Sequence, residues 1–351
     1  MIAWKGKARR LALAVLFTWG LLELLLRLTA PYLGPRVSTE LFRSYSIERC
    51  GIYLLDPLHS IQFMWPNRHT RCMVNGYAWS NDTDERGLRN PRDCASDILV
   101  FGDSFLYGHG VELADSAVDI LRRKYGWKVY NMARQGDSIY QQYTLFRLYF
   151  DILKPRHLIL CPFANDFQDI EQVRSPQEQL QPMEFKPDYV DEVRSAMHSP
   201  EARTPRGNWF TTSYAYRLVA MLGRKDKADG GFQPPANEAV REERFQRQGY
   251  FYALLFQDLV TRARAAGCTV DVVYMDTAEN RDAYWSVEQE RIGKYFAWLC
   301  ARSRVPFYST RELLQGHPEY LLPHDGHLSP LGNQAFAALV ARECPKTWAS
   351  K

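Results

Sequence analysis

The chain lacks a surplus of positive charge outside its N-terminus. Its 351 residues include 44 Lys and Arg and 40 Asp and Glu, which gives a net charge of +4. Residues 1–36 hold six of the basic residues and one acidic residue, so the remainder has 38 basic and 39 acidic residues, a net charge of −1. The basicity is therefore local, and a domain-wide basic surface for nucleic acid is excluded.

Motifs for metals and redox chemistry are also missing. The seven cysteines form no Cys-x-x-Cys pair, which argues against a zinc ribbon and a thioredoxin-type site. No spacing of possible ligands is typical of a metal site, and we expect neither a metal nor an organic cofactor. Because Cys50 and Cys72 flank a loop-rich stretch, they are the best candidates for a disulfide.

A long apolar run is present at residues 11–30, where fifteen of the twenty residues are Ala, Val, Leu, Phe or Trp. A helix needs about 20 such residues to span the hydrocarbon core of a bilayer. Four basic residues lie just before the run, at positions 5, 7, 9 and 10. The positive-inside rule therefore places residues 1–10 in the cytoplasm and the body outside.

The interpretation of residues 11–30 as a single-pass membrane anchor has two alternatives. One is a cleaved signal peptide with an apolar region at 11–22, although Pro31 directly after Thr29-Ala30 is a poor residue just after a cut. The other is a buried core helix. Glu23 and Arg27 interrupt the run, but they lie four residues apart on one helix face and can pair.

The rest of the chain shows a change of pattern near residue 97. Residues 31–96 are rich in turn formers, which predicts loops and short strands packed on the main domain. From there, apolar strands alternate with helices, which predicts an α/β domain over 97–345 with a parallel sheet. Strands are expected at 98–101, 127–130, 157–161, 269–275 and 305–308, and helices at 115–124, 138–153, 246–266, 285–303 and after Pro330. A polar insertion at 168–245, with one amphipathic helix near 213–222, interrupts this alternation.

The first strand of the domain ends in Gly102-Asp103-Ser104. Ligands of such sheets bind beyond the carboxyl ends of the strands, so Ser104 stands where a nucleophile is useful. A turn serine or a helix cap is the alternative. A second Gly-Asp-Ser at 136–138 does not directly follow a buried strand, and we therefore favour Ser104.

Further candidate groups follow the next strands and precede the last helix. Gly136 can offer a backbone N–H without a side chain in the way, and Asn165 can offer a side-chain N–H. Asp325 precedes His327 closely enough to orient its imidazole, as a serine nucleophile requires of its base. His324 could compete with His327. The remaining histidines, those at 59, 69, 109, 157, 198 and 317, have no partner pattern, and we interpret them as surface or packing residues.

Four short blocks together resemble the SGNH/GDSL hydrolase family. The blocks are Gly102-Asp103-Ser104, Asn131 with Gly136, Asn165-Asp166, and Asp325 with His327. The resemblance covers about residues 97–345. Two features depart from familiar patterns: Asp-x-His replaces the family's Asp-x-x-His, and the Gly-x-Ser-x-Gly elbow of α/β-hydrolases is absent.

In addition, the layout of Glu23 and Arg27, then a loop segment with Asn81 and Gly87-Leu88-Arg89, then the Gly-Asp-Ser strand looks like the membrane-anchored bacterial branch of the SGNH/GDSL family. That branch implies a single-pass inner-membrane protein whose body faces the periplasm or the cell exterior.

The resemblance implies a flavodoxin-like three-layer α/β/α sandwich and ester hydrolysis. It implies Ser104 as nucleophile, His327 as base and Asp325 as the partner of the base. The Ser104 and Gly136 N–H groups and the Asn165 side chain would form the oxyanion hole. Asp103 and Asp166 are expected to brace loops rather than to react.

The sequence therefore predicts a serine ester hydrolase that forms an acyl-enzyme. From its location, the substrate would be an O-acyl group on an envelope glycan or a lipid. One alternative is an O-acyltransferase with the same Ser–His pair, and a second is a non-catalytic glycan-binding or scaffold protein. Four residues of the insertion either contact substrate or form a surface face or helix core: Arg203, Trp209, Tyr214 and Tyr216.

Overall fold

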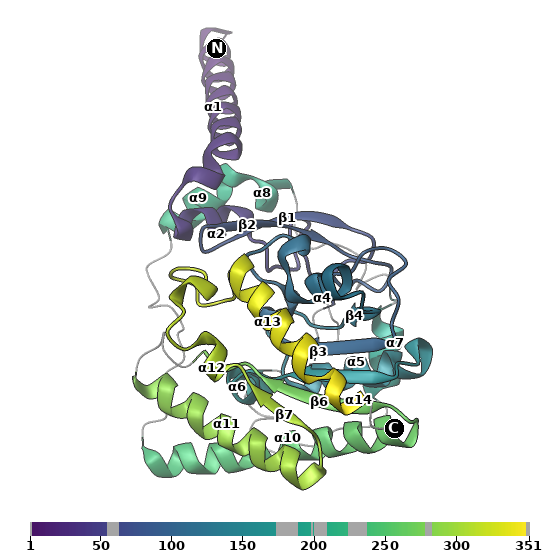
Figure 1. Cartoon of the computed structure of the whole chain (residues 1–351). Coiled ribbons are helices and arrows are strands. Elements are labelled where there is room, and N and C mark those ends of the chain that lie inside the picture. Colours follow the sequence, from purple (N-terminus) through teal and green to yellow (C-terminus); the bar gives the residue numbers. More distant parts are fainter. Residues whose placement is uncertain are drawn as a thin grey trace.

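A five-stranded parallel sheet forms the centre of the computed structural model, which describes residues 2–54, 63–172, 189–197, 199, 209–223, 237–277 and 283–348. Its strands lie in the order β4-β3-β5-β6-β7 (Figure 1). This is the 2-1-3-4-5 order of flavodoxin-like sheets, as the resemblance implied. The strands are β3 (Ile98–Gly102), β4 (Val129–Asn131), β5 (His157–Cys161), β6 (Thr269–Tyr274) and β7 (Phe307–Ser309).

Helices cover both faces of this sheet and complete three layers. Leu99 and Phe101 of β3 join one apolar cluster, whereas Ile98 and Val100 join another, because successive side chains of a strand point to opposite faces. The first cluster includes α5 (Ile139–Leu153), α10 (Glu238–Ala265) and α11 (Ala283–Ser303). The second includes α4 (Ala117–Tyr125) and α13 (Pro330–Glu343). The predicted α/β/α fold is confirmed.

Shorter elements complete the body. The helical ones are α3 (Ser104–Tyr107), α6 (Asn165–Gln172), α7 (Tyr189–Met197), α8 (Trp209–Thr212), α9 (Tyr214–Gly223), α12 (Arg311–Leu314), α14 (Pro345–Trp348) and three short 3-10 turns at 30–32, 113–115 and 318–320. Helix α10 begins eight residues before the predicted start at 246. Asn237 caps it, since its side chain accepts a hydrogen bond from Val240 N, and a polar first stretch hides this start from periodicity.

The N-terminal region has more regular structure than expected. Besides the hairpin of β1 (His69–Val74) and β2 (Tyr77–Asp82), it contains α2 (Pro35–Phe42), which was not predicted. Pro35 at the first helical position favours this start, since its φ suits the helix and its missing N–H is not needed there. The described part of the predicted insertion includes α7, α8 and α9; Arg203 and His198 lie outside the described residues.

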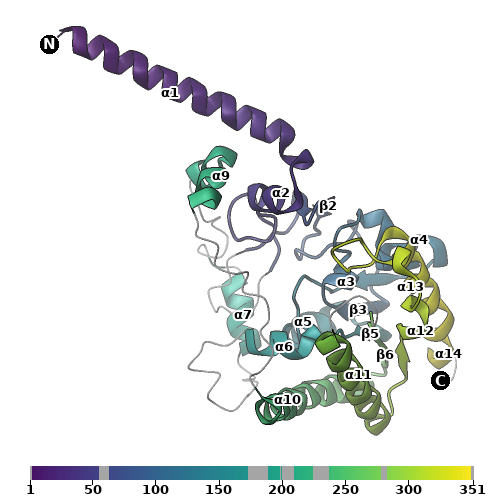
Figure 2. The same ribbon diagram turned by 90° about the vertical axis from the view of Figure 1, so that its left-hand side faces the viewer.

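Helix α1 (Ile2–Thr29) projects from the body (Figures 1 and 2). It is long and apolar enough to cross a membrane, with a mean hydropathy of 1.9 in its most apolar window. Most of its described side chains are exposed, including large ones such as Leu16 and Phe17. This exposure excludes the alternative of a buried core helix.

The predicted disulfide between Cys50 and Cys72 is wrong, since both are free thiols. Cys72 lies on β1 inside an apolar cluster with Trp79, where burial raises its pKa to about 12. Cys50 instead lies beside Arg217 of α9, which donates to its sulfur. The two side chains therefore belong to different surroundings, and flanking a loop was not sufficient evidence for a bond.

Candidate active site

Ser104 stands where β3, the second strand of the sheet, turns into α3. Asp103 caps α3, because its Oδ1 accepts a hydrogen bond of 3.0 Å from Phe105 N. The turn is tight: a Cβ at Gly102 would come within 3.1 Å of Cys161 O and 3.2 Å of Leu106 Cβ. A side chain at position 102 would therefore push the turn that carries Ser104 away from β5.

Ser104, His327 and Asp325 form one row of hydrogen bonds. Ser104 Oγ lies 2.7 Å from His327 Nε2, and His327 Nδ1 lies 2.5 Å from Asp325 Oδ1. With the proton on Nδ1, His327 donates to the carboxylate and leaves Nε2 free to accept from the serine hydroxyl. These are the three side chains that the resemblance named, and the structure brings them together. His324 is exposed in the turn just before them.

The short Asp-x-His spacing is accommodated by a tight turn. Asp325 N and Gly326 N both donate to Leu322 O, and Gly326 has a φ of +87°. This turn lets Asp325 Oδ1 accept from the backbone N of His327, at 3.3 Å, as well as from its ring. The carboxylate thus reaches the imidazole although it lies one residue closer than in the family pattern.

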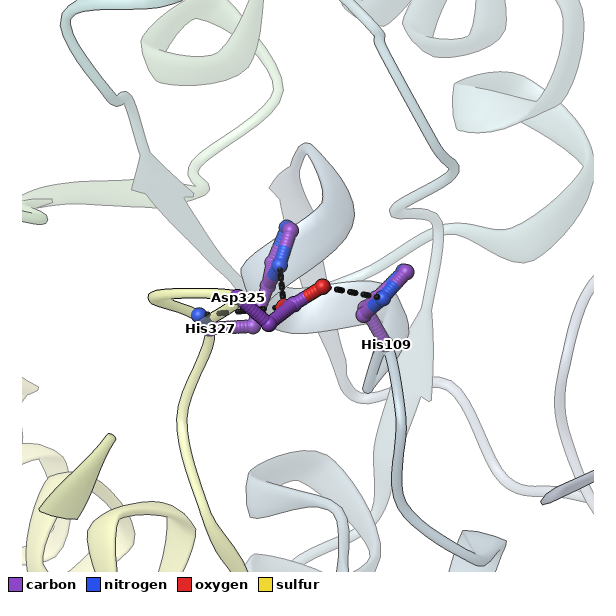
Figure 3. A group of neighbouring side chains, drawn as sticks. All are labelled: His109, Asp325 and His327. Carbon is purple, nitrogen blue, oxygen red and sulfur yellow. Dashed lines mark hydrogen bonds and ion pairs between the residues drawn. The ribbon is translucent and has the colours of Figure 1, made fainter. Parts of the chain in front are cut away.

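Sequence reasoning missed His109, which lies on the other side of Asp325 (Figure 3). Its Nε2 is 3.3 Å from Asp325 Oδ2, and its ring stacks on that of His327 with centroids 4.1 Å apart. Its Nδ1 contacts Gln135 Nε2 at 2.8 Å; an amide nitrogen only donates, so Nδ1 accepts and the proton lies on Nε2, toward Asp325. The available signal was its place in Gly108-His109-Gly110, five residues after Ser104.

Asp325 is consequently held as an ionised carboxylate. Its side chain is only 1% exposed, and this burial alone would raise its pKa. Hydrogen bonds from His109 and His327 outweigh the burial and lower the pKa well below its usual value. A permanently charged partner is what a histidine base needs when it takes a proton.

The N-terminal region contributes directly to this site. Asn75, in the turn between β1 and β2, donates from Nδ2 to Asp325 Oδ2 at 2.8 Å. Next to it, Tyr77 OH donates to Pro323 O at 2.7 Å, so the hairpin holds the turn that carries Asp325. Tyr45 OH lies 2.6 Å from His109 Nδ1. None of these roles was predicted, because they depend on contacts between distant parts of the chain.

A buried arginine fixes the loop that links Ser104 and His109. Arg89 is 1% exposed, and its guanidinium donates to Gly108 O at 2.7 Å and to Val111 O at 2.8 Å. It also donates to Tyr107 O. Satisfying three carbonyls of one loop with a single rigid group keeps that loop in one conformation. Arg89 belongs to the region predicted only as loops packed on the main domain.

The predicted oxyanion donors lie on both sides of Ser104. Since β3 lies between β4 and β5, the loop with Gly136 and the helix start with Asn165 flank the serine turn. Gly136 is exposed with a φ of +69°, and a Cβ there would meet nothing within 4 Å. Its need for glycine is therefore conformational, not a matter of crowding. Asn165 donates from Nδ2 to Asp169 Oδ2 at 2.9 Å.

Two buried carboxyl groups, those of Asp103 and Asp166, are the chain neighbours of Ser104 and Asn165. Burial raises the pKa of Asp103 to about 6, although hydrogen bonds from Phe105 N and Ser104 lower it. Burial and the charge of Asp103 raise the pKa of Asp166 well above its usual value. Asp166 accepts from Gln142 Nε2 at 3.2 Å. These contacts are those of loop-bracing groups, as expected for both aspartates.

The second Gly-Asp-Ser has a different environment. Ser138 is fully buried and caps α5, where it forms a capping box with Gln141. Its neighbour Asp137 accepts two hydrogen bonds of 2.9 Å from the buried guanidinium of Arg134. The Asp137 carboxylate and the Ser138 hydroxyl thus both form hydrogen bonds that stabilise the start of α5.

His109, Asp325 and His327 are also a group that could hold a metal ion, since their ligand atoms lie within 4.8 Å of one another. In this structure the same atoms make other bonds: His327 Nε2 contacts Ser104 Oγ, and Asp325 Oδ1 contacts His327 Nδ1. A metal ion there would displace the row of hydrogen bonds. The two uses of these side chains are therefore mutually exclusive.

No protein-family model matches the sequence, and no curated protein matches it. Similar solved structures include the esterase EstA from Pseudoalteromonas sp. (11% identity, 72% of this chain and 98% of that chain, TM-score 0.41). They also include a G-D-S-L family lipolytic protein from Veillonella parvula (11%, 71% and 98%, 0.39) and the acetylxylan esterase Axe2 from Geobacillus stearothermophilus (12%, 70% and 92%, 0.39). These structural neighbours are esterases and G-D-S-L lipolytic proteins, the class that the sequence motifs resemble.

Proposed function

We propose that this chain is a serine ester hydrolase of the SGNH/GDSL type. The observation that carries the proposal is the hydrogen-bonded row of Ser104, His327 and Asp325 at the carboxyl end of β3, the second strand of the sheet. A hydroxyl is a weak nucleophile until a base removes its proton, and an imidazole 2.7 Å away is placed to do so. The buried, ionised Asp325 stabilises the imidazolium that forms.

The reaction has two steps. Ser104 Oγ attacks the carbonyl carbon of the ester while its proton passes to His327 Nε2; the alcohol then leaves with that proton, and an acyl-serine remains. Water next attacks the acyl-serine, giving its proton to the same nitrogen, and the carboxylic acid leaves as Ser104 regains a proton. In both tetrahedral states the oxyanion would be stabilised by the N–H groups of Ser104 and Gly136 and by Asn165.

We propose the location and the substrate class from α1. Residues 11–30 would span a bacterial inner membrane, residues 1–10 would lie in the cytoplasm, and the body would face the periplasm or the cell exterior. An ester hydrolase held there meets the O-acyl groups of envelope glycans and lipids. An alkaline phosphatase fused to the C-terminus should be active and a green fluorescent protein fusion dark. The reverse pattern would contradict both location and substrate.

Labelling with a fluorophosphonate tests the catalytic proposal most directly, since the probe reacts only with an activated serine. The full-length protein in detergent should be labelled at Ser104, and Ser104→Ala should abolish labelling. Ser138→Ala is the matched control, because it removes the hydroxyl of the same tripeptide, and its labelling should equal that of the wild type. Absence of labelling in the wild type would favour the non-catalytic alternative.

Turnover then identifies the acyl group. A series of p-nitrophenyl esters from acetate to palmitate should give a single optimum, and added EDTA should leave the rate unchanged. Product analysis with a sugar alcohol present separates hydrolysis from transfer. Free acid is expected; an acylated sugar as the main product would replace hydrolysis by acyl transfer while leaving the roles of Ser104 and His327 in place.

A further inference from the structure

Helix α9, which belongs to the predicted insertion, packs against the C-terminal part of α1 (Figures 1 and 2). Leu26 and Ala30 of the N-terminal region form a buried apolar cluster with Ala215 of α9. Trp19 and Leu218 pack against the edge of this cluster. The contact therefore covers residues 19–30 of the N-terminal region, which is the outer half of the apolar run.

Polar bonds at the same place lock the two helices together. Glu23 Oε2 accepts from Ser213 Oγ at 2.8 Å and from Ala215 N at 2.9 Å, so a carboxylate of α1 caps the N-terminus of α9. Arg27 pairs with Glu23 at 2.7 Å and donates to Thr212 O at 3.3 Å. The free N–H groups and the positive end of a helix are suitable partners for this carboxylate.

These bonds set the depth of α9. Glu23 precedes the end of the apolar run at residue 30 by seven positions, which corresponds to about 10 Å along a helix axis. If α1 spans the bilayer, the N-terminus of α9 lies at that depth, inside the outer boundary of the hydrocarbon region. Glu23 and Arg27 are then not defects of the span, because each is bonded where it lies.

The side of α9 that faces away from the body is apolar. Tyr216, Val219 and Leu222 are 41%, 54% and 73% exposed, and their spacing of three places them on one side of the helix. Arg217 points the other way; it is buried and pairs with Glu48 of the body at 3.2 Å. The exposed apolar face continues that of α1, where Leu24 is 55% exposed.

We propose that α9 is an interfacial membrane helix whose exposed face, made of Tyr216, Val219 and Leu222, contacts outer-leaflet phospholipid. The proposal rests on the membrane span proposed for α1 and is independent of the esterase activity. It assigns Tyr214 and Tyr216 to membrane attachment: the Tyr214 ring lies 4.8 Å from the Arg27 guanidinium. With two attached helices, the body is held against the bilayer in a restricted orientation, not tethered by one flexible point.

Photocrosslinking in the full-length chain tests this. Benzoylphenylalanine is placed at Val219 or Leu222, and the protein is reconstituted in vesicles of phosphatidylethanolamine and phosphatidylglycerol with a labelled phospholipid. Leu24 of α1 is the positive control. Val240 of α10 is the matched negative control, since it is 49% exposed and α10 lies at the opposite end of the body from α1 (Figures 1 and 2). Lipid adducts at 219 and 222 should approach those at 24 and exceed those at 240 by about 10-fold.

Three outcomes would overturn the proposal. Adducts at 24 but only background at 219 and 222 would place α9 outside the bilayer. Crosslinks from 219 and 222 mainly to a second copy of the chain would make this face an interface between protomers. Absence of lipid adducts at 24 would remove the span itself and α9 with it, while the fluorophosphonate result at Ser104 would still decide the catalytic proposal separately.

Discussion

Gly102-Asp103-Ser104 and Gly136-Asp137-Ser138 are the same tripeptide, and both occur at the carboxyl edge of one sheet. The first begins at the last residue of β3, so Ser104 emerges directly at the strand end, between β4 and β5, and faces His327. The second follows β4 only after a further loop, and Ser138 turns inward to cap α5. The distance from the strand end decides which serine can meet the histidine of a distant loop.

Asp103 and Asp137, the aspartates of the two tripeptides, also have different surroundings. Burial raises the pKa of both to about 6. Asp137 has a cation beside it, since Arg134 binds both of its oxygens. The largest contacts that oppose the burial of Asp103 are hydrogen bonds from Phe105 N and Ser104. One tripeptide is thus neutralised by an ion pair, and the other keeps an acidic group beside the candidate nucleophile.

Exchange of each serine gives the largest expected difference. Ser104→Ala should lower kcat/KM for a chromogenic ester by about 10⁴-fold or more, because no other group can form the acyl-enzyme. Ser138→Ala should leave kcat/KM within about 2-fold and cost about 1 kcal/mol of stability as a lost helix cap. Circular dichroism checks the fold of both. If Ser138→Ala were inactive and Ser104→Ala active, the nucleophile would be Ser138 and not Ser104.

Removal of the charge on Asp325 comes next. Asp325→Asn should lower kcat by about 10³- to 10⁴-fold, somewhat less than loss of Ser104, because an amide no longer stabilises the imidazolium or fixes its tautomer. The measurement is kcat on the same ester, with Asp325→Glu as the charged comparison. A variant as active as the wild type would show that the row of hydrogen bonds is not catalytic.

A smaller effect is expected at the oxyanion hole. Asn165→Ala should lower kcat by about 100- to 1,000-fold, with KM changed only a few-fold, because the donor acts mainly on the charged intermediate. Asp169→Asn is the control. It keeps a side chain of the same size and changes the group that accepts the hydrogen bond from the Asn165 amide. Full kcat in Asn165→Ala would remove this residue from the hole.

His109 should act as a positioning residue with a weaker effect. His109→Phe keeps an aromatic ring to stack on His327 but removes the polar contacts with Asp325, Gln135 and Tyr45. We expect kcat to fall by about 10- to 100-fold, because Asp325 loses one of its partners. The pH profile of kcat/KM should shift as well, since His109 helps keep Asp325 ionised. Loss of stability with unchanged kcat and profile would assign it to packing alone.

The last prediction concerns the pH dependence of the free energy of unfolding. The pKa of Asp103 is about 6 in the fold, above its usual 3.8. The stability that this group contributes is therefore complete below about pH 4 and is lost as the pH rises through 6. Asp103→Asn should lose less unfolding free energy than the wild type between pH 4 and 7, by up to about 3 kcal/mol, which is about 1.4 kcal/mol for each pKa unit by which the carboxyl is raised. Asp137→Asn should be less stable than the wild type at pH 7, since it removes the carboxylate that binds two nitrogens of the buried Arg134 guanidinium. Denaturant titrations at both pH values decide, and equal slopes in wild type and Asp103→Asn would contradict the prediction.

Much of the fold was predictable because it depends on local patterns. Apolar runs such as Ile98–Phe101 mark buried strands, and the alternation with helices leaves only a parallel sheet with right-handed crossovers. Boundaries were less predictable where polar residues hide a cap, as at Asn237 of α10. The supposed disulfide failed for another reason: Cys50 and Cys72 are near in sequence, but their side chains enter different clusters.

The sequence by itself determined which chemical groups stand at strand ends, since Ser104, Gly136 and Asn165 each follow a strand. It also determined that one N-terminal helix is apolar enough to cross a membrane. Only the tertiary structure decided that Asp325 lies between two histidines, that Asn75 and Arg89 hold the site from the N-terminal region, and that Glu23 caps α9. The reason is physical: a hydrogen bond needs atoms within about 3 Å, and for residues 18 to 250 positions apart no local pattern carries that distance.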